Sequence, residues 1–93
     1  MIVRYTRRAE RDLAFILSYL TERSPNGAQN VATSLQESIR FIVDNPRGGK
    51  RTLKPFLFVK IVPEYPYKIF YRFRGELVEL VRVRHASRRP WFE

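Results

Sequence analysis

The amino-terminal part of the chain alternates apolar and polar residues with a helical period. Residues 2–5 predict a short β-strand, and Thr6 is a suitable N-cap for a helix that begins at Arg7. Apolar residues then recur at three- and four-residue steps, at Ala9, Leu13, Ile16, Leu17 and Leu20. Phe15 and Tyr19 form a weaker pair, four residues apart, on a neighbouring face. The pattern therefore predicts one helix packed on a core by a single face.

A second helix follows a predicted break at Thr21–Gly27. Ser24 and Pro25 read as an N-cap followed by proline at the first helical position, where its missing N–H costs nothing. The helix is expected to run to about Val43, before the breaking segment Asp44–Gly49. Its inner face would carry Ala28, Val31, Ala32, Leu35, Ile39 and Ile42. Two helices joined this closely are expected to form an antiparallel hairpin.

The period changes to two in the second half of the chain. After a basic connection at 46–58, a short strand is expected around Val59 and Ile61. The segment 67–73 alternates strictly, with Tyr67, Ile69, Tyr71 and Phe73 on one side. Gly75-Glu76 reads as a tight turn, and 77–85 as the last strand.

These elements predict one α+β domain over residues 1–93, in the order β-α-α-β-β-β. Short turns between the closing strands imply an antiparallel sheet with the helical hairpin on one face. No repeat or linker divides the chain.

Composition narrows the class of protein. The chain has no cysteine, which excludes disulfides and thiolate metal sites and fits a reducing cytoplasm. No apolar run approaches the roughly 18 residues of a membrane helix, so we expect no membrane association. The formal net charge is +9, with 14 arginines against 4 lysines. This surplus predicts an acidic partner, either nucleic acid or an acidic protein segment.

The strand alternation places much of this charge on one sheet face. With the aromatic residues inward, the open face is expected to carry the following residues around Phe70: Lys60, Lys68, Arg72, Arg74, Arg82 and Arg84. Such a face suits a phosphate backbone or an acidic protein segment, although any solvated sheet face also alternates. Val78 and Leu80 share a parity with Arg82 and Arg84, which requires either a bulge or partial cover of both faces.

Few residues suggest catalysis. The acidic residues are scattered and Gly48-Gly49 lacks the phosphate-loop spacing, so we expect neither a metal nor a cofactor. His85 is the one histidine, and it lies among arginines that favour its neutral form. It is a candidate general base for RNA cleavage, or else a strand cap or partner contact.

Four segments resemble the RelE/ParE toxin superfamily. Tyr5–Leu13 is similar to the "x-A-x-x-D-L" start of the family's first helix. Ser24-Pro25, together with Asn45–Gly49 at the end of the second helix, is similar to the family's helical hairpin and the loop that follows it. Pro66–Phe73 is similar to the "(P/G)-Y-R-I-x-Y" strand, and Val81–Arg89 to the "V-x-H-x-x-R" ending. The resemblance implies a type II toxin with a cytoplasmic location and a cognate antitoxin that wraps over it. A hetero-oligomer with a ParD-like antitoxin, acidic in its carboxyl-terminal segment, is thus expected.

The superfamily has two activities. Members like RelE cleave mRNA on the ribosome; the resemblance would then make His85 and Lys68 the catalytic candidates. Members like ParE inhibit DNA gyrase and serve in plasmid stabilisation. Pro90-Trp91-Phe92 follow Arg88-Arg89 where a catalytic tyrosine would be needed, and the hairpin resembles the ParE branch.

We therefore expect a non-enzymatic gyrase inhibitor, with mRNA endonuclease and plain nucleic-acid-binding module as alternatives. The expected gyrase-effector region comprises Arg82, Arg84, His85, Arg88, Arg89 and Trp91. The expected antitoxin-binding residues are Phe15, Tyr19, Lys60, Lys68, Phe70 and Arg72.

Overall fold

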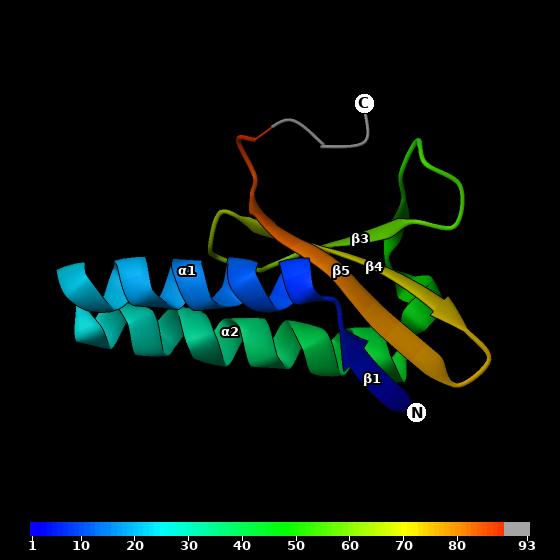
Figure 1. The fold of residues 1–93 in the computed structure, drawn as a ribbon, viewed down its shortest axis with the longest axis horizontal. Coiled ribbons are helices and arrows are strands. Elements are labelled where there is room, and N and C mark those ends of the chain that lie inside the picture. Colours follow the sequence, from blue (N-terminus) through cyan, green and yellow to red (C-terminus); the bar gives the residue numbers. More distant parts are fainter. Residues whose placement is uncertain (89–93) are drawn as a thin grey trace.

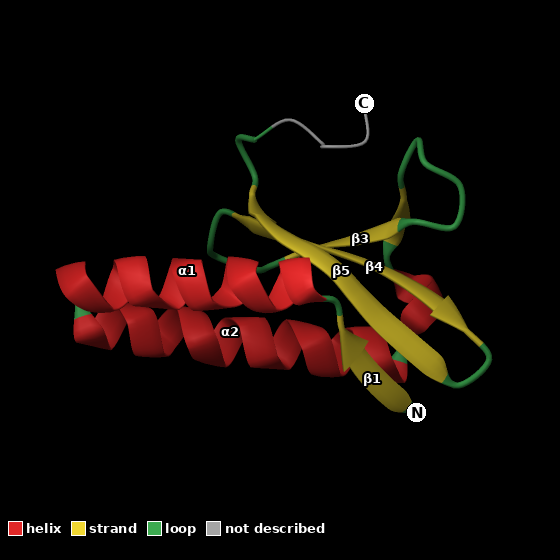
Figure 2. Ribbon diagram, viewed as in Figure 1, coloured by secondary structure: helices red, strands yellow, loops and turns green. Residues whose placement is uncertain are grey.

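A computed structural model describes residues 1–88 and places a helical hairpin against one face of a five-stranded sheet (Figures 1 and 2). The elements are β1 (Ile2–Tyr5), α1 (Arg7–Arg23), α2 (Pro25–Asp44), a 3₁₀ helix (Pro46–Gly48), β2 (Lys50–Arg51), β3 (Phe58–Ile61), β4 (Tyr67–Arg74) and β5 (Leu77–His85). The predicted α+β class and element order are confirmed. The two-residue strand β2 and the 3₁₀ helix lie in the predicted connection at 46–58.

Local capping sets the bounds of both long helices. The Thr6 side chain accepts a hydrogen bond from the Ala9 amide, as predicted for an N-cap. The break between the helices lies within the predicted range Thr21–Gly27 and has the predicted Ser24 cap, but it is narrower than expected, because Ser24 alone separates the helices. Its backbone N–H donates to the Leu20 carbonyl, and its side chain caps α2 at Gly27. Neither helix has a stretch long and apolar enough to cross a membrane.

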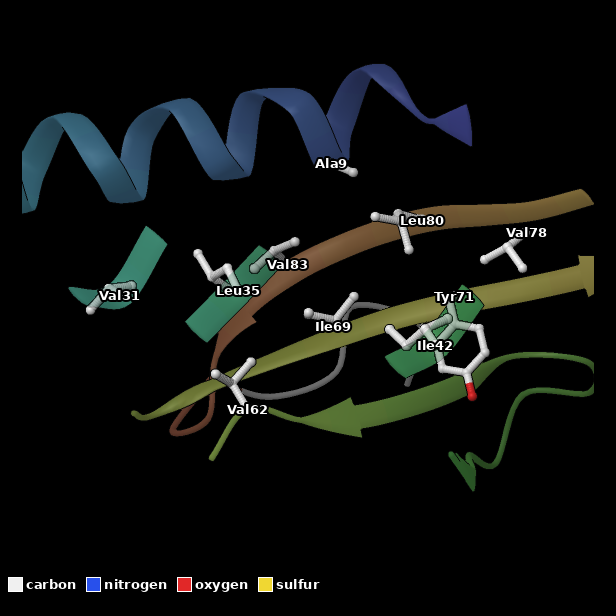
Figure 3. Close-up of a cluster of buried hydrophobic side chains, with 10 residues drawn as sticks. All are labelled: Ala9, Val31, Leu35, Ile42, Val62, Ile69, Tyr71, Val78, Leu80 and Val83. Carbon is white, nitrogen blue, oxygen red and sulfur yellow. The ribbon is translucent and has the colours of Figure 1, made fainter. Parts of the chain in front are cut away.

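The sheet has the order β1-β5-β4-β3-β2. β1 pairs with β5 in parallel, and the other neighbouring strands are antiparallel. Figure 3 shows the core between sheet and helices, where side chains of α1 and α2 meet those of β4 and β5. Its buried members are Ala9, Val31, Leu35, Ile42, Val62, Ile69, Tyr71, Val78, Leu80 and Val83.

A bulge in β5 explains the change of parity along this strand. Phe70 is opposite Arg82 and Tyr71 is opposite Leu80, so Val81 is the additional residue. Val78 and Leu80 therefore face the core, as does Val83 beyond the bulge. Of the two alternatives that the sequence allowed, the structure contains the bulge.

The register of β3 corrects the prediction for Lys60. Lys60 pairs with Ile69, and Phe58 pairs with Tyr71. Paired residues point to the same side of a sheet, so the side chains of Lys60 and Phe58 both face the helices. Phe58 stacks on Tyr71 with 5.8 Å between ring centroids. This register is favoured because burying the larger apolar surface of Phe58 stabilises the core more than burying Val59 would. The Lys60 ammonium lies 4.2 Å from the ring centroid of Phe41 on α2. Lys60 is thus absent from the open face.

Tyr71 fixes the connection between α2 and β2. Its hydroxyl donates to the Pro46 carbonyl at 2.7 Å and accepts from the Gly49 amide at 3.1 Å. A Cβ at position 49 would overlap this hydroxyl, so glycine is required for the close approach. Burial raises the pKa of the Tyr71 hydroxyl, although the Gly49 hydrogen bond opposes that rise. The hydroxyl therefore keeps its proton and its donor role.

Candidate functional site

A hollow in the described part of the chain lies between α1 and the end of β5. It has a volume of about 680 Å³. Helix side chains form one wall and strand side chains the other. Its lining residues are Asp12, Phe15, Ile16, Tyr19, Tyr67, Arg82, Val83, Arg84, His85, Ser87 and Arg88. We call this hollow the α1–β5 groove.

The groove exists because α1 replaces β1 beside the second half of β5. β1 pairs only as far as Leu80, and the chain then turns into the helix. The Thr6 hydroxyl donates to the Val81 carbonyl at 2.8 Å, and the Asp12 carboxylate accepts from the Val83 amide at 2.9 Å. These side chains satisfy backbone groups that would otherwise lie on an open sheet edge.

Asp12 also holds the first arginine of the groove. Its carboxylate accepts from Arg82 Nε at 2.8 Å and from Nη2 at 3.2 Å. Both side chains are largely buried, with exposed fractions of 17% for Asp12 and 18% for Arg82. A two-point contact of this kind fixes the plane of the guanidinium as well as its position.

Positive charge exceeds negative charge among the described lining residues. Three guanidinium groups, those of Arg82, Arg84 and Arg88, face the single carboxylate of Asp12. Burial and then the like charges of Arg82 and Arg88 lower the pKa of Arg84, whereas Asp12 opposes this shift. An anion bound in the groove would relieve this repulsion.

His85 is oriented by Ser87 two residues later. Its Nδ1 lies 2.7 Å from the Ser87 Oγ and accepts the Ser87 backbone N–H at 3.1 Å. Since a backbone N–H only donates, the proton of the neutral ring lies on Nε2. The ring contacts Tyr67 edge-on, with 5.8 Å between centroids. Burial and then the neighbouring Tyr19 hydroxyl raise the pKa of Tyr67, which keeps its phenol protonated.

Two stacked aromatic side chains of α1 contribute to the helical wall of the groove. Phe15 and Tyr19 stack with 6.2 Å between ring centroids, and the Arg23 guanidinium lies 3.5 Å from the Tyr19 ring centroid. Phe15 is 67% exposed and Tyr19 47% exposed. Exposed flat rings beside guanidinium groups can contact both apolar and anionic parts of a partner.

The structure brings together two sets of residues that the sequence treated separately. The expected effector residues Arg82, Arg84, His85 and Arg88 share the α1–β5 groove with the expected antitoxin contacts Phe15 and Tyr19. Arg89 and Trp91 lie outside the described residues.

Three of the other expected antitoxin contacts, Lys68, Phe70 and Arg72, lie on the sheet face away from the helices, which they share with Arg82 and Arg84 of the groove. Lys68 is paired with Arg84 and Arg72 with Glu79, while Phe70 is only 5% exposed. The carboxylate of Glu79 accepts hydrogen bonds from Arg72 and from Arg4 of β1. Burial alone would raise the pKa of Glu79, but these two guanidinium groups lower it below its ordinary value. Arg72 is therefore engaged in a charge cluster that joins β1, β5 and β4.

Sequence reasoning assigned no role to Asp12, although a signal was present. Asp12 lies three residues after Ala9 on the apolar stripe of α1. A carboxylate on such a stripe indicates a buried partner, because burying a charge without one is costly. The partner itself, 70 residues away in Arg82, depends on the tertiary fold.

Solved toxin structures share this fold. The structure described as "Chromosomal ParDE TA system from P. aeruginosa" matches with a TM-score of 0.81 at 20% identity, over 94% of this chain and 97% of that chain. The intact E. coli RelBE toxin–antitoxin complex matches with a TM-score of 0.64 at 16% identity, over 94% and 98%. These likenesses show that the chain has the same fold as the two solved structures.

Sequence comparison gives the family. Residues 3–90 match the sequence model of the family described as "ParE toxin of type II toxin-antitoxin system, parDE". Toxin RelE2 of Caulobacter vibrioides is 35% identical over 84 residues, which are 90% of this chain and 93% of that protein. The chain belongs to the ParE toxin family of type II toxin–antitoxin systems, within the RelE/ParE superfamily.

Proposed function

We propose that this toxin inhibits DNA gyrase and blocks replication until its antitoxin binds. The observation that carries the proposal is the arrangement of Lys68 and His85. The register pairs Lys68 with Arg84 and His85 with Tyr67, so the two candidate catalytic side chains belong to opposite faces of the sheet. In addition, His85 Nδ1 already accepts the Ser87 amide, which occupies the lone pair that a general base needs.

The proposed effector region is centred on the α1–β5 groove. Arg84 and Arg88 supply positive charge there, and Asp12 orients Arg82 toward the same hollow. His85 contributes contact surface, and Arg89 and Trp91 follow directly in the sequence. This combination suits a macromolecular partner with acidic groups better than it suits acid–base chemistry.

The proposed inhibitor of the toxin is a ParD-like antitoxin with an acidic carboxyl-terminal segment, in a hetero-oligomer. The matching solved structures are those of a ParDE system and a RelBE complex. Phe15 and Tyr19 offer exposed apolar contacts, and Lys68, Arg72 and the surroundings of Phe70 offer the basic sheet face. The proposed site of action is the cytoplasm, where gyrase meets chromosomal or plasmid DNA.

A second candidate function is ribosome-dependent mRNA cleavage. It is favoured by one observation, the 35% identity to a protein named Toxin RelE2. In that case His85 and Lys68 would act on a bound mRNA, which requires the Ser87 contact to open.

Two reactions with the antitoxin-free toxin distinguish these functions. Gyrase supercoiling is followed together with a DNA-cleavage readout, and mRNA cleavage is followed on stalled ribosomes. We expect inhibited supercoiling with intact mRNA, and we expect Arg84→Ala/Arg88→Ala to relieve the inhibition.

The matched control removes two exposed arginines of the first helical turn, as Arg7→Ala/Arg8→Ala, and should still inhibit gyrase. Cleaved mRNA with normal supercoiling, abolished by His85→Ala in a folded protein, would contradict the proposal and support the endonuclease.

A further inference from the structure

The connection between β2 and β3 is a basic hairpin with an apolar tip. Figure 1 shows it beside the start of β3, extending away from both helices. Leu53 is 87% exposed and Phe56 is 84% exposed, the highest values among the large apolar side chains of the described residues. Exposed apolar groups of this size at a projecting tip are typical of contact sites for a partner.

The hairpin is closed by its own hydrogen bonds. Thr52 uses both its amide, at 3.1 Å, and its hydroxyl, at 2.9 Å, to donate to the Leu57 carbonyl. The Lys54 amide donates to the Thr52 hydroxyl, and Leu57 is buried as an anchor. Phe56 has a φ of 65°, a left-handed conformation that costs a bulky residue about 1 kcal/mol or more. The chain thus holds a strained backbone that keeps an aromatic ring in solvent.

The charge around this tip has one sign. Residues 46–58 contain Arg47, Lys50, Arg51 and Lys54 and no acidic residue. A hollow of about 660 Å³ beside Phe56 is lined further by Arg4, Arg72 and Arg74, and its Glu79 is engaged by Arg4 and Arg72. Further cationic side chains therefore lie beside the apolar tip.

We propose that this hairpin, residues 50–58, is an arm that binds duplex DNA. Lys50, Arg51 and Lys54 would contact phosphates, and Leu53 and Phe56 would enter the minor groove as an apolar wedge between base pairs. The charged residues of the arm are all cationic, which complements the phosphates of a duplex, and its exposed apolar side chains complement the faces of bases. The arm lies at the opposite end of the sheet from His85, and its DNA contact would be additional to gyrase inhibition and independent of it.

The electrostatic part is tested on the full-length, antitoxin-free protein by fluorescence anisotropy with a short DNA duplex over a range of salt. Lys50→Gln/Arg51→Gln/Lys54→Gln should weaken binding by about tenfold or more and flatten the salt dependence by about 0.9 per lost phosphate contact. The control Arg7→Gln/Arg8→Gln/Arg11→Gln removes the same charge from exposed positions of α1 and should have a much smaller effect. Equal weakening by both triple variants, or no binding by the wild type, would overturn the proposal.

The wedge is tested with a duplex that carries 2-aminopurine, whose fluorescence rises when a base step is unstacked. Wild type should raise the signal, and Leu53→Ser/Phe56→Ser should lose it while thermal unfolding stays unchanged. Ile2→Ser, which also removes an exposed apolar group, should keep the signal. Loss of antitoxin binding by the hairpin variant with unchanged DNA binding would identify a protein docking site and overturn the DNA assignment. DNA binding without gyrase inhibition would instead count against the proposed function alone.

Discussion

At the scale of single residues, the fold depends on polar groups that do more than one task. The Tyr71 hydroxyl joins β4 to the Pro46–Gly49 segment while its ring packs in the core. Glu79 holds two arginines from different strands, and Asp12 holds a backbone amide and a guanidinium. Removing one of these groups leaves several partners unsatisfied, so small substitutions should have large effects.

Tyr71→Phe tests the first of these groups. The variant retains the ring stack with Phe58 but leaves the Pro46 carbonyl and the Gly49 amide without their partner. We expect the free energy of unfolding to fall by about 1–3 kcal/mol, measured by urea denaturation. Tyr5→Phe, at a half-exposed tyrosine of β1, should change it by about 0.5 kcal/mol or less. Similar values for both variants would contradict the role of the hydroxyl.

Glu79 makes stability depend on pH in the acid range. Its pKa in the folded state lies below its ordinary value, so the unfolded chain binds a proton more readily. The stabilisation is therefore present above the ordinary value, near 4.5, and is lost as the pH falls through the lower folded-state pKa. Glu79→Gln should destabilise the protein by about 1–3 kcal/mol at neutral pH, and the difference from wild type should shrink on acidification. Denaturation curves that keep a constant difference down to acid pH would contradict this assignment.

At the scale of elements, the groove is a consequence of where β1 ends. A short parallel strand covers only half of β5, and the helix that follows completes the edge through side chains. Packing and the proposed effector region are thus joined at one place, because the side chain that closes the edge also orients Arg82.

Asp12→Asn tests this junction at nearly constant size. Asparagine has no charge, and its NH2 group would replace the oxygen that accepts from Arg82 Nη2, so the remaining oxygen accepts more weakly from Arg82 Nε and from the Val83 amide. We therefore expect faster hydrogen exchange at Val83, measured by NMR. Gyrase inhibition, if it is the activity, should weaken because Arg82 is no longer fixed. The control Glu10→Gln removes an exposed carboxylate of the same helix and should leave Val83 protected. Unchanged exchange in Asp12→Asn would show that α1 does not close this edge.

At the scale of the whole molecule, the two proposed contact surfaces lie at opposite ends of the sheet. The α1–β5 groove is near the end of β5, and the basic hairpin is near the start of β3. A ParE toxin that met gyrase with one surface and DNA with the other would explain a net charge of +9 without a catalytic centre.

Deletion of residues 86–93 tests whether the proposed effector region is separable from the fold. β5 ends at His85, and within the described residues the deletion removes the backbone hydrogen bonds from Ala86 to Pro66 and from Arg88 to His85. We expect growth arrest to be abolished while circular dichroism and antitoxin binding remain. Arrest that survives the deletion would refute the assignment of this segment.

The sequence by itself determined the two long helices, the strands β1, β3, β4 and β5, and the family. The signals for these features are local and can be recognised without knowledge of the fold. They are the capping residues Thr6 and Ser24, the apolar periods of 3.6 and 2, and the motifs at 5–13 and 81–89. It also placed the inner residues of β4 correctly, since strict alternation leaves one solution.

Only the tertiary structure decided which residues share a site. Lys60 faces the helices because Phe58 gains more from burial, and Arg82 meets Asp12 because α1 lies beside the free edge of β5. The bulge at Val81 separates the two parities of β5, and the same strand register puts Lys68 and His85 on opposite faces. These outcomes depend on competition between distant residues for the same space, which no local pattern in the sequence contains.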